Sequence, residues 1–165
     1  RTQVRNIGGQ RFEFSAAYPA LTRAEFAPVH AFIMAQQGMA ESFSIVLPQI
    51  SEKSGDAAGT VVADGAGAIG DTSVDVDGAS GTFKAGDVIK FAGHSKVYMI
   101  VSDVTAASGA ATIDIVPALR EAVADNEAVI FDDVPFLVRL NDDVQEYSLG
   151  LASIVEYEVD MIEAL

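Results

Sequence analysis

The sequence predicts a mainly β protein with one principal α-helix, in which a β-sandwich or barrel-like main domain carries an inserted small antiparallel β domain. Short segments that alternate apolar and polar residues recur between turns rich in Gly, Asp and Asn, as is typical of strands. Only one stretch has convincing helical spacing. The composition changes at Ser51: residues 51–82 contain no aromatic residue, whereas strands resembling those of the first 50 residues return after 127. These three observations predict both the class and the insertion.

The predicted helix covers 22–37. Thr22 and Glu25 have the spacing of a capping box, in which the carboxylate reaches back to the first amide. Gly38 is placed to end the helix in the left-handed conformation. Pro28 removes a backbone hydrogen bond, so the helix is expected to kink there or to become regular only near this residue. The predicted buried stripe consists of Phe26, Val29, His30, Ile33 and Met34.

Strands are predicted on both sides of this helix and throughout the rest of the chain. The segments before and after it could be parallel neighbours or lie in different sheets. A three-stranded antiparallel meander is the clearest part of the insert, and Asn141–Asp143 is expected to form a hairpin turn. In the last strand Glu156, Glu158 and Asp160 alternate with apolar residues, which predicts one wet and one dry face. The predicted strands are 10–15, 42–48, 59–63, 72–76, 88–91, 96–101, 111–116, 128–131, 134–140, 144–149 and 152–159.

The predicted domains follow from these patterns. Residues 1–50 and 128–165 would form the main β domain that carries helix 22–37, and 51–127 would form the inserted β domain. Half of the residues are hydrophobic, which is enough for a real core in a chain of 165 residues.

The net charge is −14, and the sequence pI is about 4.2. This charge argues against nucleic acid and against anionic membranes as partners, because both are bound through Lys and Arg. The charge is also uneven: it is +1 over 1–50, −7 over 51–127 and −8 over 128–165. Such polarity suits head-to-tail contact between copies of the chain. No apolar run approaches the roughly 20 residues that span a bilayer.

Neither of the two histidines predicts catalysis. His30 falls on the apolar stripe and is expected to pack at the edge of the core. His94 stands beside Ser95 in a predicted hairpin loop, but no Gly-x-Ser-x-Gly pattern surrounds that serine. We therefore interpret His94 as a polar residue at a loop tip.

Some carboxylates and glycines of the sequence resemble parts of known ligand sites. Asp71, Asp75 and Asp77 resemble part of a calcium loop, but the twelfth position of an EF-hand loop starting at Ser73 is Lys84. The run 65–70 matches G-x-G-x-x-G without a helix after it. Asp132, Asp133, Asp142 and Asp143 read as turn residues. With no cysteine in the chain, we predict no catalytic, cofactor-binding or metal-binding residue.

Two stretches resemble the tail proteins of tailed bacteriophages. The first is YPALTRAEFAPVHAFIMAQQGMAESFSIVLP, in which Thr-Arg-Ala-Glu opens a helix that leads through a glycine to an aromatic strand. The second is FKAGDVIKFAGHSKVYMIVSDVTAASGAATIDIVPALR, in which a Lys-Ala-Gly-Asp turn opens a hairpin and a later strand ends at Pro and Arg. Together they cover about half of the chain.

This resemblance implies a structural virion protein of the distal-tail or baseplate-hub type, without enzyme activity or cofactor. Such a protein would be made in the bacterial cytoplasm and would form a ring, usually a hexamer, that joins the tail tube to the tip. Its partners would be copies of itself, the tube and the tip proteins. The alternatives left open are a neck or head-to-tail connector (tail-completion) protein and, from another class, a carbohydrate-binding or hydrolytic β domain.

Overall fold

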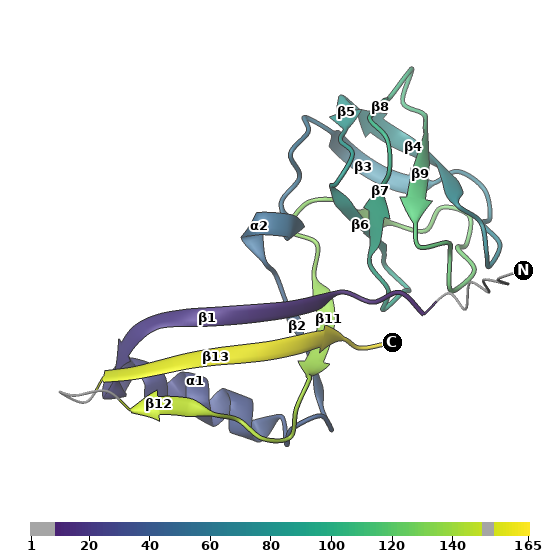
Figure 1. The fold of residues 1–165 in the computed structure, drawn as a ribbon. Helices are drawn as coiled ribbons and strands as arrows, with labels where there is room; N and C mark the ends of the chain where they lie inside the picture. Colours follow the sequence, from purple (N-terminus) through teal and green to yellow (C-terminus); the bar gives the residue numbers. More distant parts are fainter. Residues whose placement is uncertain (1–8, 150–153) are drawn as a thin grey trace, which may run out of the picture. The chain divides into compact units, whose positions relative to one another are not determined.

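The computed structural model describes residues 9–149 and 154–165 (Figure 1). The protein is mainly β with one principal helix, as predicted, because all but one of its longer elements are strands. The helices are α1 (Arg23–Ala35) and α2 (Pro48–Ser51). The strands are β1 (Glu13–Thr22), β2 (Ser42–Ile45), β3 (Ala58–Ala63), β4 (Ser73–Ser80), β5 (Thr82–Phe83), β6 (Val88–Phe91), β7 (Tyr98–Ile100), β8 (Val104–Thr105), β9 (Ala111–Val116), β10 (Val129–Ile130), β11 (Phe136–Leu140), β12 (Tyr147–Leu149) and β13 (Ile154–Glu163).

The chain divides into two compact units. The barrel unit comprises Val46–Phe136, with Gly9 and Gln10 also assigned to it. The terminal unit comprises Arg11–Ile45 and Leu137–Leu165. The domain boundaries proposed from the sequence, 1–50 with 128–165 and 51–127, stay a prediction. In the described part of the chain, no helix has both the length and the hydropathy needed to cross a membrane.

The barrel unit is built on a nearly closed sheet of six strands in the order β10-β6-β7-β9-β4-β3. An antiparallel bridge between Val62 and Ala128 brings the two ends of this order together. The Ala63 amide donates to the Glu127 carbonyl across the same seam at 2.9 Å. The predicted meander is confirmed, since β6, β7 and β9 are consecutive antiparallel neighbours.

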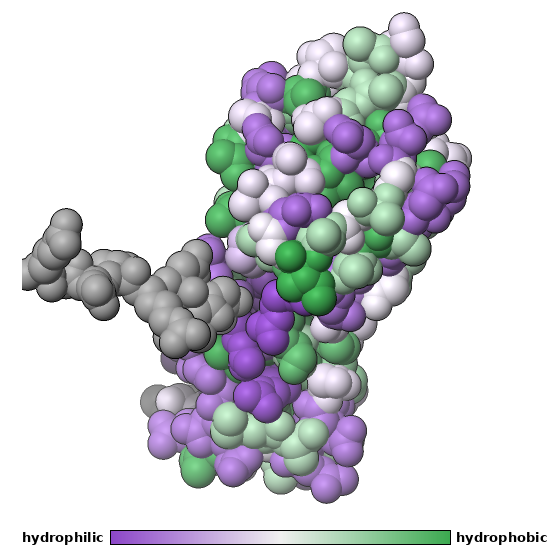
Figure 2. Space-filling model, turned by 90° about the vertical axis from the view of Figure 1, so that its right-hand side faces the viewer, coloured by the Kyte–Doolittle hydropathy of each residue, from purple (hydrophilic) through white to green (hydrophobic). Residues whose placement is uncertain are grey.

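Period-two patterning explains the barrel core. Val74 and Val76 of β4 point inward with Ile113 and Ile115 of β9, and the residues between them remain exposed. Aromatic side chains fill the rest, including Phe83, Phe91 and Tyr98, each no more than 1% exposed. On the face seen in Figure 2, hydrophobic and hydrophilic residues are interspersed over this unit, the upper part of the view. The barrel-like architecture, which was expected of the main domain, is found in the barrel unit.

The terminal unit is an open sheet in the order β1-β13-β11-β2, with β12 also paired to β13. β1 follows one edge of β13 along its whole length, from Glu13 opposite Ile162 to Thr22 opposite Ile154. β11 and β12 follow each other along the opposite edge. Helix α1 lies against one face, where the Phe26 ring contacts Tyr157 edge-on at 5.5 Å between centroids.

The predicted alternation of the last strand is confirmed. Val155, Tyr157, Val159 and Met161 are buried on the side that faces α1, whereas Glu156, Glu158 and Asp160 are exposed on the other side. The predicted hairpin turn at Asn141–Asp143 is wrong. β13 is long enough to pair with β11 and β12 in succession, so this segment connects two strands on the same edge.

Helix α1 differs from the prediction in three respects. It begins at Arg23, so Pro28 lies within it and does not mark its regular start. Its last residue is Ala35, and both Gln37 and Gly38 adopt positive φ angles, 54° and 67°. Met34 is 58% exposed because it falls one position beyond the stripe in which Phe26 and Ile33 are buried. The carboxylate arm of the capping box is formed, since the Thr22 amide donates to Glu25 Oε2 at 2.9 Å.

Candidate functional site

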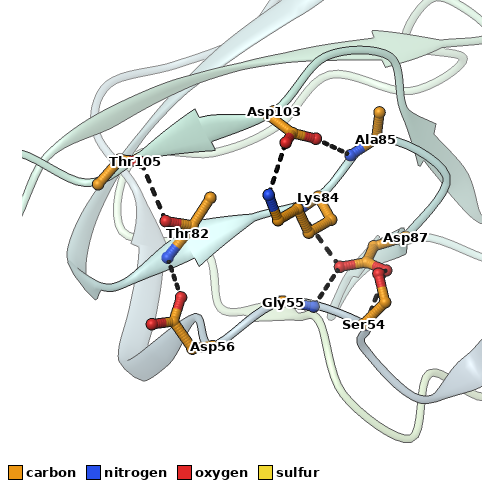
Figure 3. Close-up of polar contacts among 9 residues, drawn as sticks. All are labelled: Ser54, Gly55, Asp56, Thr82, Lys84, Ala85, Asp87, Asp103 and Thr105. Carbon is orange, nitrogen blue, oxygen red and sulfur yellow. Dashed lines mark hydrogen bonds and ion pairs between the residues drawn. The ribbon is translucent and has the colours of Figure 1, made fainter.

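A polar network in the barrel unit surrounds the turn Lys84–Asp87 (Figure 3). Asp87 is only 6% exposed. Its Oδ1 accepts from the Ser54 amide at 2.8 Å and from the Ser54 hydroxyl at 2.6 Å. Its Oδ2 accepts from the amides of Gly55 and Lys84, both at 3.3 Å. One buried carboxylate therefore ties the segment that leads into the barrel to the turn that opens the β6–β7 hairpin.

A second carboxylate holds the outer side of the same turn. Asp103 accepts from the Ala85 amide at 2.9 Å and from Lys84 Nζ at 2.6 Å. The Ala85 amide, and then the Lys84 ammonium, lower the pKa of Asp103, and the same hydrogen bond raises the pKa of Lys84. These acids are satisfied by local donors, so the turn is a structural device and not a set of free catalytic carboxylates.

His30 lies where the sequence placed it, at the edge of the core of the terminal unit. Its ring stacks on Phe26 at 5.0 Å and meets Tyr147 edge-on at 5.3 Å. It is half-buried against these two aromatic rings. This position supports the packing role that was predicted.

The prediction that His94 is a polar loop tip is wrong, because this residue is only 5% exposed. The Tyr98 hydroxyl accepts from the Arg120 amide at 3.2 Å and lies 3.1 Å from His94 Nδ1. The hydroxyl proton is thus free to be donated to Nδ1, which leaves Nε2 to donate to the Ala122 carbonyl at 3.4 Å. Burial raises the pKa of Tyr98, which keeps this hydroxyl protonated. His94 is a structural link between the hairpin loop and residues 120–122.

The carboxylates of the calcium-like segment do not converge. Asp71 accepts from the Ala68 amide, Asp75 from the Thr112 hydroxyl and Asp77 from the Gly78 amide. Within residues 9–149 and 154–165, no group of three or more His, Cys, Asp or Glu side chains is arranged to hold a metal. Asp132 forms an ion pair with Lys53 at 3.0 Å, and Asp133 has a positive φ of 49°.

The glycine-rich run 65–70 is used for packing. The Gly67 amide and carbonyl both pair with Val123, each at 3.0 Å, and the Gly70 amide donates to the Leu119 carbonyl at 2.8 Å. A Cβ on Gly67 would lie 2.9 Å from a methyl of Leu119, so close contact explains this glycine. No helix follows the run in the structure, and four of its amides, those of Gly65, Gly67, Ala68 and Gly70, already donate within the protein.

A groove of about 800 Å³ in the terminal unit is lined by Ala17–Ala20, Gln145–Ser148 and Glu156–Glu158. It contains three carboxylates and three tyrosines but no histidine, lysine or cysteine. Glu146, Glu156 and Glu158 give this groove a negatively charged lining.

Exposed apolar side chains are the more informative feature of the terminal unit. Phe32, Met34 and Met39 are 49%, 58% and 38% exposed. No Asp, Glu, Lys or Arg occurs from Phe26 to Ala40. A helix that is apolar on its outer side as well as its inner side is typical of one that another surface covers.

A family model described as "Distal tail protein pb9, B domain" matches residues 50–134, which is just over half of the chain. This chain belongs to that family of phage distal tail proteins. The comparison with curated proteins gives no match.

The matched range of this distal tail protein falls on the barrel unit and includes the Lys84–Asp87 turn. The family is structural, so the protein has a structural role in the phage tail and is located in the tail of the virion. The resemblance seen in the sequence is confirmed at the level of the family.

Sequence reasoning missed two features of this distal tail protein. The role of Asp87 depends on Ser54 and Gly55, which lie more than thirty positions away, and no local pattern marks that contact. The outward apolar face of α1 did leave a signal, namely the charge-free run from Phe26 to Ala40. This signal was missed because Met34 was expected to be buried.

Proposed function

We propose that this distal tail protein assembles into a ring, a hexamer, at the distal end of the phage tail and joins the tail tube to the tip, without enzyme activity. The observation that carries the proposal is the unfinished edge of the terminal sheet. Among the described residues β1 pairs with β13 alone, and β2 ends the strand order. Family membership supplies the location in the tail.

These edges suit copies of the same chain. A ring needs two different surfaces on each subunit that fit each other, and an open sheet has two different ends. β1 is ten residues long and carries a single charge, Glu13, whereas β2 has the uncharged sequence SFSI. Long, uncharged edges are places where another chain adds a strand unless they are protected. Pro19 and the register shift between Tyr18 and Leu21 protect only the last part of β1.

The distal tail match favours this position in the tail over a neck or connector position. A hydrolytic or carbohydrate-binding role has no comparable support in the described residues. The turn acids Asp87 and Asp103 are engaged by amides of the barrel unit.

The test is to measure the mass of the purified chain by mass photometry and to image it by electron microscopy, alone and with isolated tail tubes. Rings of six subunits that cap the end of a tube are the expected result. A chain that stays monomeric at every concentration and ignores the tube end contradicts the proposal.

A deletion locates the assembly surface. Replacing 56–125 by a short linker removes most of the barrel unit and should leave a folded chain that still forms rings. Assembly lost with the fold intact, as judged by circular dichroism, would place the contacts in the barrel and not in the terminal sheet.

A further inference from the structure

We infer that the outer face of the terminal sheet binds the arginine-bearing segment 1–5 of a neighbouring copy of the chain. The outer face is the side of β13 that carries Glu156, Glu158 and Asp160, opposite to the side that packs against α1. The inference rests on the proposed ring and adds to it one pair of surfaces that hold neighbouring subunits together.

Two adjoining grooves run along the outer face. The groove of about 800 Å³ and a second one of about 510 Å³ share Gln145, Glu146 and Glu158 in their linings. The second groove adds Asp142 and Asp160 to the carboxylates of the first. None of the residues that line either groove is Lys, Arg or His. The grooves therefore form one continuous surface of negative charge.

The terminal unit does not neutralise this charge. Among the described residues, the side chains of Glu146, Glu156 and Asp160 take part in no hydrogen bond or ion pair. Acids on the same side of β13 are two residues apart, which separates them by about 7 Å. This distance is shorter than the Debye length of about 8 Å at physiological ionic strength, so the acids repel one another. A positively charged partner would relieve that repulsion.

The first residues of the chain carry the complementary charge. Residues 1–11 contain three arginines and no Asp or Glu, and no other stretch of eleven residues has three basic side chains without an acid. The chain as a whole carries −14, so most of its surface is repelled by the outer face. Within a second copy, this segment is the part that the outer face attracts.

The aromatic rings beside the acids favour arginine over lysine. Tyr18 and Tyr147 line the groove of about 800 Å³ and are 37% and 44% exposed. A guanidinium group stacks on aromatic rings and binds carboxylates with two hydrogen bonds, whereas an ammonium group is a compact, strongly hydrated charge. Both basic residues of the segment, Arg1 and Arg5, are arginines.

The spacing of the charges also matches. Glu156 and Asp160, at the two ends of the row of acids, are four residues apart in β13. Arg1 and Arg5 are separated by the same number of residues. In an extended chain four residues span about 13 Å, and alternate side chains point to the same side. The two arginines of an extended segment would therefore meet both ends of the row at once.

A neighbouring copy is better placed than the same chain to supply this segment. The groove of about 800 Å³ begins at Ala17 of β1. A chain that reversed direction at Gly8–Gly9 would bring Arg5 back only to Phe12. In that arrangement Arg5 stays short of the groove, whereas a segment from another subunit has no such restriction. Contact between two different surfaces is also head-to-tail, as a ring requires.

Removing the two charges is the first test. We expect the double variant Arg1→Gln/Arg5→Gln to need at least a tenfold higher concentration for ring assembly, measured by mass photometry. Arg23→Gln/Arg120→Gln is the matched control, because both arginines are exposed and the net charge changes equally. It should assemble like the parent. Added sodium chloride should weaken assembly of the parent and of the control more than that of Arg1→Gln/Arg5→Gln. Rings that form equally readily with both double variants overturn the inference.

Cross-linking locates the contact, and the chain contains no cysteine that would interfere. A tagged Gln3→Cys variant is mixed with an untagged Ser148→Cys variant, whose cysteine lies in the groove lining, and treated with a short bis-maleimide. We expect tagged–untagged dimers. Far fewer should form when Met34→Cys replaces Ser148→Cys, because Met34 is exposed on the other side of the same unit.

The possible results separate the docking of the segment from the ring itself. Rings without the Gln3–Ser148 product between chains refute the docking but leave the proposed function standing. A product that forms only when both cysteines are in one chain refutes the docking to a neighbour in the same way. The lack of any ring refutes the proposed function.

Discussion

The two units of this protein differ in how they treat the edges of their sheets. In the barrel unit the sheet returns on itself at Val62 and Ala128, and the buried Asp87 is bound by amides of the same unit. In the terminal unit the sheet stays open, three large apolar residues of the helical segment face outward, and a row of acids is exposed. The barrel unit nearly closes its own sheet, whereas the terminal sheet has strand edges that pair with nothing else among the described residues.

The largest effect should come from the barrel core. Phe91 is fully buried, so Phe91→Ala should lower the free energy of unfolding by about 3–5 kcal/mol through lost transfer energy and the cavity left behind. Urea denaturation of the full chain measures it. Ile69→Ala, at an exposed position of the same unit, should change it by less than about 0.5 kcal/mol. If the free energy of unfolding fell equally in the two variants, burial of Phe91 in the barrel core would not be a main source of stability.

The next effect concerns the acid that organises the barrel turn. Asp87→Ala removes the acceptor of the Ser54, Gly55 and Lys84 amides. It should lower the free energy of unfolding by about 3 kcal/mol. Asp103→Ala breaks an exposed pair with Lys84 and should cost less. Thermal melting compares the two variants. A larger loss for Asp103→Ala would contradict the central place given to Asp87.

A smaller effect is expected from hydroxyl groups, one in each unit. Tyr98→Phe removes the acceptor of the Arg120 amide and the donor to His94. It should therefore lower the free energy of unfolding by about 1–2 kcal/mol. Tyr147→Phe is the matched change in the terminal unit, where no hydrogen bond of that hydroxyl occurs among the described residues, and stability should not change. Similar losses for both tyrosines would remove this contrast between the units.

The smallest effect is a pH dependence at the start of α1. The Thr22 amide and hydroxyl lower the pKa of Glu25 in the folded chain. Because the folded pKa is below the ordinary value of 4.5, this stabilisation is present above pH 4.5 and is lost as the pH falls through the folded pKa. Glu25→Gln should flatten this part of the melting profile between neutral pH and the acid range. An unchanged profile argues against the capping contact.

Local periodicity could be read from the sequence because each strand buries alternate residues. β6 and β9 were predicted with their observed ends, and so was the wet side of β13. The family could also be recognised, because the Lys84–Asp87 turn is a short contiguous pattern. Each of these features depends on residues that lie near one another in the chain.

Features made by distant segments could not be read in this way. His94 is buried because residues 120–122 lie against it. The local sequence Gly93–Ser95 contains no pattern that predicts this contact. The order of strands likewise depends on the length of β13, which takes β11 and β12 on one edge and so turns an expected hairpin into a connection. Period-two alternation gives the face of a residue but not the neighbour of its strand.

The two ends of the barrel unit are held together. The Val134 amide donates to the Ser51 carbonyl at 3.0 Å, and Lys53 pairs with Asp132 at the same distance. Because the first and last residues of this unit lie close together, the flanking chain has to span only a short distance between them. Such a unit can therefore be replaced by another of different content. The strands outside these two contacts can therefore keep their sequence when the segment between them is replaced.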